Sequence, residues 1–237
     1  ESFDEAYWPE LFYKKENDLA KKHIDILYEQ YKKFVKQLFN TKAGVAEAMA
    51  FIDVIFQLFY QFQDGNEFTA KEERIILAQG EIISTTLFHL HLKEKGISSV
   101  LISALDFMRI DEDDEPLIDY IRMNASAELE KFDGQKLFIT QGFICRNSKG
   151  EVDNLKRGGS DYTASLIGAA LQVEEIQIWT DIDGFHNNDP RHVPNTKPIA
   201  RLSFDEAAEL SYFGAKILHP QSVFPARKYN VPVRLLD

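Results

Sequence analysis

Hydrophobic side chains recur every three or four residues through the first seventy positions, which is the spacing of one face of an α-helix. Two series show it: Leu27, Tyr31, Phe34, Val35 and Leu38, then Ile52, Ile55, Phe56, Phe59 and Phe62. Residues 40–44 separate the two series. The pattern predicts two helices packed face to face, with these aromatic rings in the core rather than around a ligand. We therefore expect residues 1–70 to form an all-helical segment.

Beyond residue 70, short apolar strands alternate with helices. Strands are predicted at 99–103, 136–140, 177–180 and 231–235. Helices are predicted after Lys71, Ser160 and Ser203, the last opened by a Ser-Phe-Asp-Glu capping box. Such alternation favours an α/β fold, a three-layer α/β/α sandwich with a mainly parallel central sheet covered on both faces. We expect residues 71–237 to form this core.

The helix predicted after Lys71 contains a glycine, Gly80, followed by an acid, Glu81. A glycine inside a helix costs about 1 kcal/mol relative to alanine, so we expect another group to approach the backbone there. An ordinary solvated glutamate is the alternative for Glu81. His89 and His91 point to different faces of this helix, so we expect them to be structural or exposed.

The composition of the chain excludes some classes of binding partner. The chain has 237 residues, a formal net charge of −11 and 44% hydrophobic residues. This charge argues against nucleic acid or an anionic membrane as the main partner. Cys145 is the single cysteine, and neither a signal peptide nor an uninterrupted run of about 18 apolar residues is present. We expect a cytoplasmic globular protein.

One segment, Lys-Arg-Gly-Gly-Ser-Asp-Tyr-Thr-Ala, has the composition of an anion site. Gly158 and Gly159 lack the Cβ atoms that hold a ligand away from the backbone, and Ser160 is predicted to be the N-cap of the following helix. The helix dipole and its free N–H groups favour an anion there, and should keep Asp161 ionised. Arg157 can clamp a carboxylate or phosphate. A capped turn with a solvated arginine is equally compatible with these residues alone.

Two further segments can meet anions. The loop after residue 180 contains three aspartates, a glycine and Arg191 beyond a strand end, where functional loops gather. Lys216 stands in an apolar stretch and requires an anionic partner. Neither G-x-x-x-x-G-K-[ST] nor G-x-G-x-x-G occurs. These features suggest phosphoryl transfer to a small acidic acceptor, with carboxylates able to hold a divalent metal.

In order and spacing, six blocks resemble the aspartate kinases of the amino-acid kinase superfamily. The blocks are residues 79–81, 141–144, 157–164, 180–184, 189–191 and 213–220. The resemblance implies the amino-acid kinase (carbamate kinase-like) fold from about residue 71 to the end, as a catalytic core. It also implies transfer of the γ-phosphate of ATP, bound with Mg²⁺, to the side-chain carboxylate of L-aspartate. This is the first step of lysine, threonine and methionine biosynthesis, and a homo-oligomer is expected in the full-length enzyme.

The resemblance also assigns residues. Glu81 would meet the amino group of aspartate and Arg157 its carboxylate, while Gly158, Gly159 and Ser160 would line the same pocket. Asp161 would organise the reacting groups and act with Lys216 in catalysis. ATP would be held by Thr180, Asp181, His186, Arg191, Lys216 and Ile217. No residue is assigned as a direct metal ligand.

The chain departs from the family pattern in several places. A Lys-Phe-Gly-Gly-Thr-Ser strand is expected before Glu1 and small regulatory (ACT) domains after the core, and neither is in the sequence. Lys156 and Cys145 replace a common glycine, and His186 a common tyrosine. A chain complete as given should bind ligands weakly and turn over little. The alternatives are a related kinase acting on N-acetylglutamate or UMP, and a non-catalytic binding module.

Overall fold

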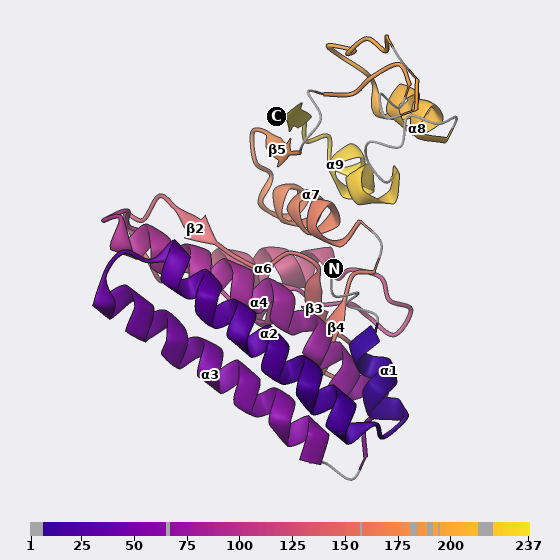
Figure 1. The fold of residues 1–237 in the computed structure, drawn as a ribbon. Coiled ribbons are helices and arrows are strands. Elements are labelled where there is room, and N and C mark those ends of the chain that lie inside the picture. The colour runs from indigo at the N-terminus through magenta and orange to yellow at the C-terminus, as the bar shows by residue number, and fades with distance from the viewer. Residues whose placement is uncertain are drawn as a thin grey trace. The chain divides into compact units, whose positions relative to one another are not determined.

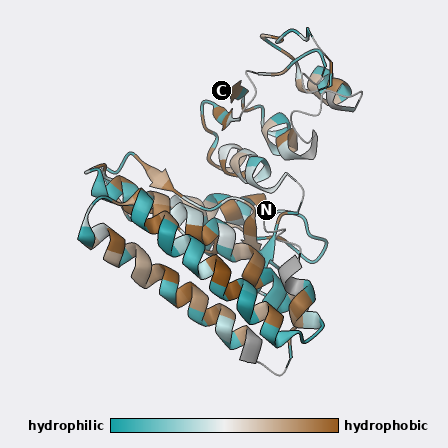
Figure 2. Ribbon diagram, viewed as in Figure 1, coloured by the Kyte–Doolittle hydropathy of each residue, from teal (hydrophilic) through white to brown (hydrophobic). Residues whose placement is uncertain are grey.

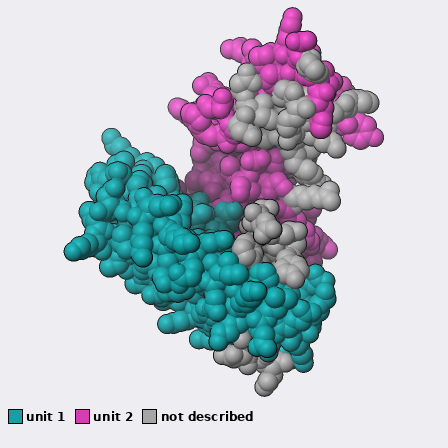
Figure 3. Space-filling model, in the orientation of Figure 1, with its two compact units in different colours: residues 1–102, 134–141, 151–153 teal, residues 103–133, 142–150, 154–237 magenta. Residues whose placement is uncertain are grey.

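The structure is a computed structural model that describes residues 7–64, 67–156, 158–180, 184–188, 192–193, 195–212 and 220–237. The chain divides into two compact units, coloured separately in Figure 3. Unit 1 comprises residues 1–102, 134–141 and 151–153, and unit 2 comprises residues 103–133, 142–150 and 154–237. Each unit is described by itself.

The described part of unit 1 is built on four helices. They are α1 (Tyr7–Tyr13), α2 (Asn17–Leu38), α3 (Lys42–Asp64) and α4 (Ala70–Glu94). Helix α3 packs against both α2 and α4, and α1 packs against α2 (Figure 1). Brown hydrophobic and teal hydrophilic residues follow one another along the three long helices in Figure 2, as expected of amphipathic helices. The prediction of an all-helical N-terminal part is confirmed.

The core of unit 1 contains part of the predicted apolar series, whereas Phe34, which was also predicted to lie in the core, is 48% exposed. Ile24, Val35, Ile52 and Phe56 are almost fully buried, and the Phe56 ring packs against three other aromatic rings of α2 and α3. By length and composition alone, α3 and α4 could also cross a membrane. Both helices contribute buried side chains to this core, as the core helices of a globular domain do. Their length and hydropathy therefore do not by themselves indicate a membrane span.

Polar contacts fix the ends of these helices. Thr69 and Glu72 form a capping box at the start of α4. The carboxylate of Glu94, at the other end of α4, accepts hydrogen bonds from Asn40 N (3.0 Å), Thr41 N (2.9 Å) and Thr41 Oγ1 (2.6 Å). These hydrogen bonds, with the Thr41 hydroxyl as the largest contribution, lower the pKa of Glu94 to about 2. The end of α4 is thus tied to the connection between α2 and α3.

A short parallel ladder completes unit 1. Strand β1 (Val100–Leu101) pairs with β2 (Phe138–Ile139), and β1 packs against α4. Both strands fall inside predicted ones but are shorter. His89 Nδ1 lies 2.9 Å from Ser99 Oγ and His91 Nδ1 lies 3.1 Å from the Leu38 carbonyl, so both histidines have structural contacts, as expected.

Unit 2 contains the remaining elements. Its helices are α5 (Ala104–Phe107), α6 (Ile118–Glu130), α7 (Gly159–Leu171), α8 (Phe204–Tyr212), the 3₁₀ helix η1 (Pro220–Val223) and α9 (Phe224–Lys228). Its strands are β3 (Ile144–Arg146), β5 (Ile176–Trp179) and β6 (Val233–Leu236), and β4 (Val152–Asn154) lies where the two units exchange chain. Helix α7 is central, because it packs against α6, α9, η1 and β5.

Strands β5 and β6 form a parallel ladder in which Ile176 pairs with Val233. Ile176 and Ile178 are buried with Ala226 of α9 on one face. Trp179, on the opposite face, is 67% exposed. The strands are parallel as predicted, but the described part of unit 2 covers only one face of this ladder.

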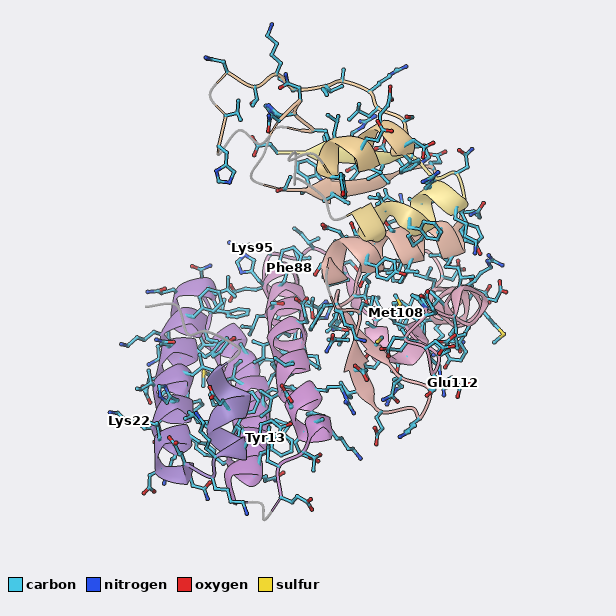
Figure 4. The ribbon with its side chains drawn as sticks, turned by 90° about the vertical axis from the view of Figure 1, so that its right-hand side faces the viewer. Tyr13, Lys22, Phe88, Lys95, Met108 and Glu112 are labelled. Atoms are coloured by element: carbon cyan, nitrogen blue, oxygen red, sulfur yellow. The ribbon has the colours of Figure 1, made fainter. Side chains whose placement is uncertain are left out.

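The acidic loop at residues 111–116 is held by hydrogen bonds to its own backbone. In it Asp111 Oδ1 accepts hydrogen bonds from the N–H groups of Asp113 and Glu115, both at 2.9 Å. Glu112, labelled in Figure 4, is exposed on this loop, whereas Met108, a few residues earlier, is buried. Strands β3 and β4 are not among the predicted strands, because three-residue strands leave no readable periodicity.

Candidate functional site

Helix α7 begins at the predicted glycine corner, but its N-cap is Gly158 and not Ser160. Gly158 has φ 69° and ψ 18°, a left-handed conformation that glycine adopts at little cost. The N–H of Tyr162 donates to the Gly158 carbonyl at 2.7 Å. Ser160 is the second residue of α7 and is exposed. The N-cap prediction is wrong because a left-handed glycine starts the helix before the serine.

The loop after β2 lies directly against this corner. The N–H of Ile144 donates to the Gly142 carbonyl at 2.7 Å around Phe143, whose φ is 66°. This is a γ-turn with a strained, non-glycine central residue. A Cβ atom on Gly142 would lie 2.9 Å from Ser160 Cα, and one on Gly159 would lie 2.4 Å from Phe143 Cδ2. Gly142 and Gly159 are therefore required by packing between the turn and α7, and not only by the approach of a ligand.

Thr163 joins the same two segments through its side chain. Its Oγ1 accepts a hydrogen bond from the N–H of Phe143 at 2.9 Å and donates to the Gly159 carbonyl at 2.7 Å. Thr163 is 3% exposed. No role for Thr163 was predicted, although a threonine four residues after Gly159 in a helix has the spacing for the hydrogen bond to the Gly159 carbonyl.

The first turn of α7 is partly desolvated. Burial raises the pKa of Asp161 above its usual value. The pKa of Tyr162 is also raised, mainly by burial and secondarily by the charge of Glu115. Desolvation therefore acts against the helix dipole that was expected to hold Asp161 ionised. Charges in such an environment interact more strongly than in water.

Lys156, the residue before Arg157, is fixed by contacts of both its backbone and its side chain. Lys156 has a left-handed backbone with φ 58°, and its N–H donates to Asn154 Oδ1 at 3.0 Å. Its ammonium group forms an ion pair with Asp114. A left-handed conformation is one that glycine adopts at little cost, so the glycine that the resemblance led us to expect at this position would fit it. Arg157 itself lies outside the described residues, so its contact with a substrate carboxylate stays a prediction.

Glu81 lies on α4, in unit 1, and is half-buried. Its carbonyl accepts a hydrogen bond from Thr85 Oγ1 at 2.7 Å, and the same hydroxyl accepts from Gln141 Nε2 at 2.9 Å. The end of strand β2 is therefore anchored one helical turn from Glu81. Gly80 is exposed, and no described atom lies within 4 Å of a Cβ added there. The described chain thus does not make the close approach expected at Gly80.

The predicted nucleotide loop begins at Thr180, whose N–H donates to the Leu236 carbonyl at 2.9 Å beyond the β5–β6 ladder. His186 is buried, and its Nδ1 lies 2.9 Å from Thr196 Oγ1. Residues 185–187 hydrogen-bond with residues 197–199. The loop therefore holds His186 in a fixed position. The other predicted nucleotide-binding residues lie outside the described part of the chain: Asp181, Arg191, Lys216 and Ile217.

Unit 2 contains a cavity of about 540 Å³ beside this loop. Its wall includes Gly184 and Phe185, which directly precede His186, together with apolar side chains of α8 and β6. This volume is in the range of small-molecule sites. Among the residues that the structure describes, no group of three or more His, Cys, Asp or Glu side chains could hold a metal ion.

Comparison with known proteins places this chain in a family. Residues 18–237 match the model of the amino acid kinase family, which is most of the chain. The chain belongs to the amino acid kinase family. Lysine-sensitive aspartokinase 3 of Escherichia coli (strain K12) is 39% identical over 161 residues, covering 67% of this chain and 36% of that protein. Aspartokinase 1, chloroplastic, of Arabidopsis thaliana is 34% identical over 218 residues, covering 90% of this chain and 38% of that protein.

Solved structures agree with this assignment. The structure of E. coli aspartokinase III in complex with aspartate and ADP matches with a TM-score of 0.77 and 31% identity, covering 90% of this chain and 48% of that one. The Clostridium acetobutylicum aspartate kinase matches with a TM-score of 0.76 at 20% identity, which supports the fold alone. The predicted amino-acid kinase fold is confirmed. The chain spans less than half the length of these relatives.

Proposed function

We propose that this protein is an aspartate kinase that transfers the γ-phosphate of ATP to the side-chain carboxylate of L-aspartate, giving 4-phospho-L-aspartate and ADP. The proposal rests on the glycine corner at the start of α7, in a chain that shares its fold and 31% identity with an aspartokinase structure holding aspartate and ADP. The other aspartokinase blocks occur in the same order along the sequence.

The corner suits a small dicarboxylate. The first N–H groups of α7 have no partner within the helix, and the positive end of its dipole lies at Gly158. An anionic carboxylate is stabilised at such a helix start. Arg157 would pair two N–H donors with the same carboxylate, and Glu81 would accept from the amino group.

The reaction makes modest chemical demands. An oxygen of the acceptor carboxylate attacks the γ-phosphorus while the bond to the β,γ-bridging oxygen breaks, and ADP leaves with that electron pair. The acceptor is already an anion, so no general base is required. Placement and neutralisation of charge must supply the rate. Asp161, in the partly desolvated first turn of α7, would organise the reacting groups.

The polyphosphate requires cations. We assign it to Lys216 and Arg191, with Thr180, Asp181, His186 and Ile217 completing the nucleotide site. Magnesium would enter with ATP and screen the charge of its β- and γ-phosphates.

Two measurements test the proposal. Isothermal titration should show binding of L-aspartate and of a nonhydrolysable ATP analogue, and hydroxylamine should trap an acyl phosphate when ATP and aspartate are both present. N-acetylglutamate and UMP serve as competing acceptors. If neither ligand produces heat on titration, the protein is better explained as a non-catalytic module that interacts with another partner. Hydroxamate formed from N-acetylglutamate would instead favour a related kinase.

A pair of arginine variants localises the site. Arg157→Ala should abolish aspartate binding and largely spare binding of the nucleotide. Arg227→Ala is the matched control, because Arg227 is exposed and pairs with Asp205 on α8. Equal loss of both ligands in Arg157→Ala would contradict the assignment of the pocket.

A further inference from the structure

Thr163 is buried at the centre of the contact between the Phe143 turn and α7, and the proposed function gives it no role. We propose that Thr163 is a positioning residue, whose hydroxyl ties the Phe143 turn to the first turn of α7 and so sets the placement of Ser160 and Asp161 toward the amino-acid substrate. This inference rests on the proposed function.

The hydroxyl of Thr163 uses its donor position and one of its two acceptor positions. Its single hydrogen is donated to the Gly159 carbonyl at 2.7 Å, and its oxygen accepts from the Phe143 N–H at 2.9 Å. Both distances are normal for strong hydrogen bonds. A side chain of the same shape without the hydroxyl would leave the Phe143 N–H without this acceptor, in a site where Thr163 is 3% exposed.

The two hydrogen bonds of Thr163 join segments that are already tightly packed against each other. The turn and the helix are already in close contact, because Cβ atoms on Gly142 and Gly159 would collide with Ser160 and Phe143. The two segments therefore cannot move closer. The hydroxyl of Thr163 prevents them from moving apart, and it holds the strained φ of 66° at Phe143.

The far end of α7 is anchored independently. Arg122 Nε of α6 donates a hydrogen bond at 3.0 Å to the carbonyl of Ala170, which lies in the last turn of α7. Gly168 lies so close to β5 that an added Cβ would be 2.4 Å from Ile176 Cγ1. Loss of the Thr163 hydroxyl should therefore shift the first turn of α7 and leave the body of the helix in place.

Ser160 and Asp161 follow Gly159 directly, so a shift of Gly159 moves both. Transfer of a phosphoryl group depends on the placement of the two reactants, and a displacement of about 1 Å can cost on the order of 100-fold in rate. We therefore expect the hydroxyl to affect use of aspartate much more than binding of the nucleotide.

Three variants of α7 test this. Thr163→Val removes the hydroxyl at nearly constant volume, and Thr163→Ser keeps it. Ser165→Ala is the matched control, because Ser165 is fully buried on the same helix and its Oγ has no hydrogen-bond partner among the described residues. Affinity for L-aspartate and for the ATP analogue is measured by titration, KM and kcat by the hydroxamate assay, and folding by thermal unfolding.

We expect Thr163→Val to lower kcat/KM for aspartate by about 10- to 100-fold while affinity for the ATP analogue stays within about twofold. Thr163→Ser and Ser165→Ala should remain close to wild type. Unchanged aspartate kinetics in Thr163→Val, or equal losses in Thr163→Val and Thr163→Ser, would overturn the inference. A wild-type protein that does not bind aspartate would instead overturn the proposed function itself.

Gly142→Ala keeps the test open if Thr163→Val does not fold. It pushes the same turn away from Ser160 with the hydroxyl of Thr163 intact. Reduced affinity for aspartate with preserved nucleotide affinity supports the inference, and unchanged aspartate affinity in a folded Gly142→Ala protein contradicts it.

Discussion

The backbone of α7 at Gly159 lies so close to Phe143 that a Cβ atom added to the glycine would be 2.4 Å from Cδ2 of the ring and 3.1 Å from Phe143 Cα. Real Cβ atoms essentially never make a contact as short as 2.4 Å, and 3.1 Å is tighter than most. The second glycine of the Gly-Gly pair is therefore fixed by the protein's own packing. The first, Gly158, is fixed by its left-handed backbone.

Gly159→Ala should destabilise the protein by about 1–3 kcal/mol, the usual range for overpacking a buried site. Rotation of the Phe143 ring can relieve the contact with Cδ2 but not the one with the Phe143 backbone. Urea denaturation measures the change. Gly150→Ala is a poor control because Gly150 has a positive φ, whereas Gly80→Ala tests a glycine without close neighbours. A Gly159→Ala protein as stable as wild type would contradict the packing described here.

Gly80→Ala should raise stability by about 1 kcal/mol, because Gly80 lies inside α4 and no described atom would meet the new methyl group. We expect the same substitution to weaken aspartate binding, since a substrate held by Glu81 would approach the helix backbone at its neighbour. Urea denaturation and titration together separate the two effects. Higher stability with unchanged aspartate affinity would place the substrate away from Gly80.

The three long helices of unit 1 were predictable because apolar residues recur along them at helical spacing, whereas α1, with seven residues, was not predicted. The start of α7 was not, since Gly158 and Ser160 both carry signals for a helix start and only the backbone geometry selects between them. The capping box of Ser203 and Glu206 was predictable from four residues, and the structure contains it, with Ser203 N donating to Glu206 Oε2 at 2.7 Å. A helix start was therefore predicted correctly where the sequence contained one start signal, and incorrectly where it contained two.

The hydrogen bond between Phe143 and Thr163 is a tertiary contact, which local sequence patterns do not predict. The two residues are twenty positions apart, and no pattern in either segment indicates that they meet. Chemistry-bearing residues such as Glu81 were found from motif resemblance, whereas the residues that hold such motifs in place depend on tertiary packing. This is why the sequence predicted the family and the glycine corner but not the hydrogen bonds that support the corner.

Asp161→Asn should stabilise the protein at neutral pH and abolish turnover. Burial raises the pKa of Asp161 in the folded state above its value in the unfolded chain, so the folded state binds more protons between the two values. Stability therefore falls as the pH rises through that window, and asparagine avoids this loss. The gain in melting temperature should vanish at pH values below about 3.9, where the unfolded aspartate is also protonated. A variant less stable than wild type at pH 7 would contradict this.

Glu94→Gln should destabilise the protein at neutral pH, with an effect that disappears in acid. The Glu94 carboxylate accepts four hydrogen bonds from Asn40 and Thr41, and the pKa of Glu94 is lowered from 4.5 to about 2. Because the folded pKa lies below the unfolded one, the unfolded chain takes up protons first as the pH falls. The stabilisation is therefore complete above about pH 4.5 and is lost progressively toward pH 2.

Thermal unfolding of wild type and Glu94→Gln across this pH range measures the difference. Glu47→Gln is the matched control: Glu47 forms an exposed ion pair with Lys93 on the adjoining turn of α4, and such surface pairs contribute little. We expect the melting temperature of Glu94→Gln to be clearly lower at pH 7, to converge on wild type near pH 2, and to differ from that of Glu47→Gln. A difference that persists unchanged at pH 2 would show that Glu94 stabilises the α2–α3 connection by packing rather than by its charge.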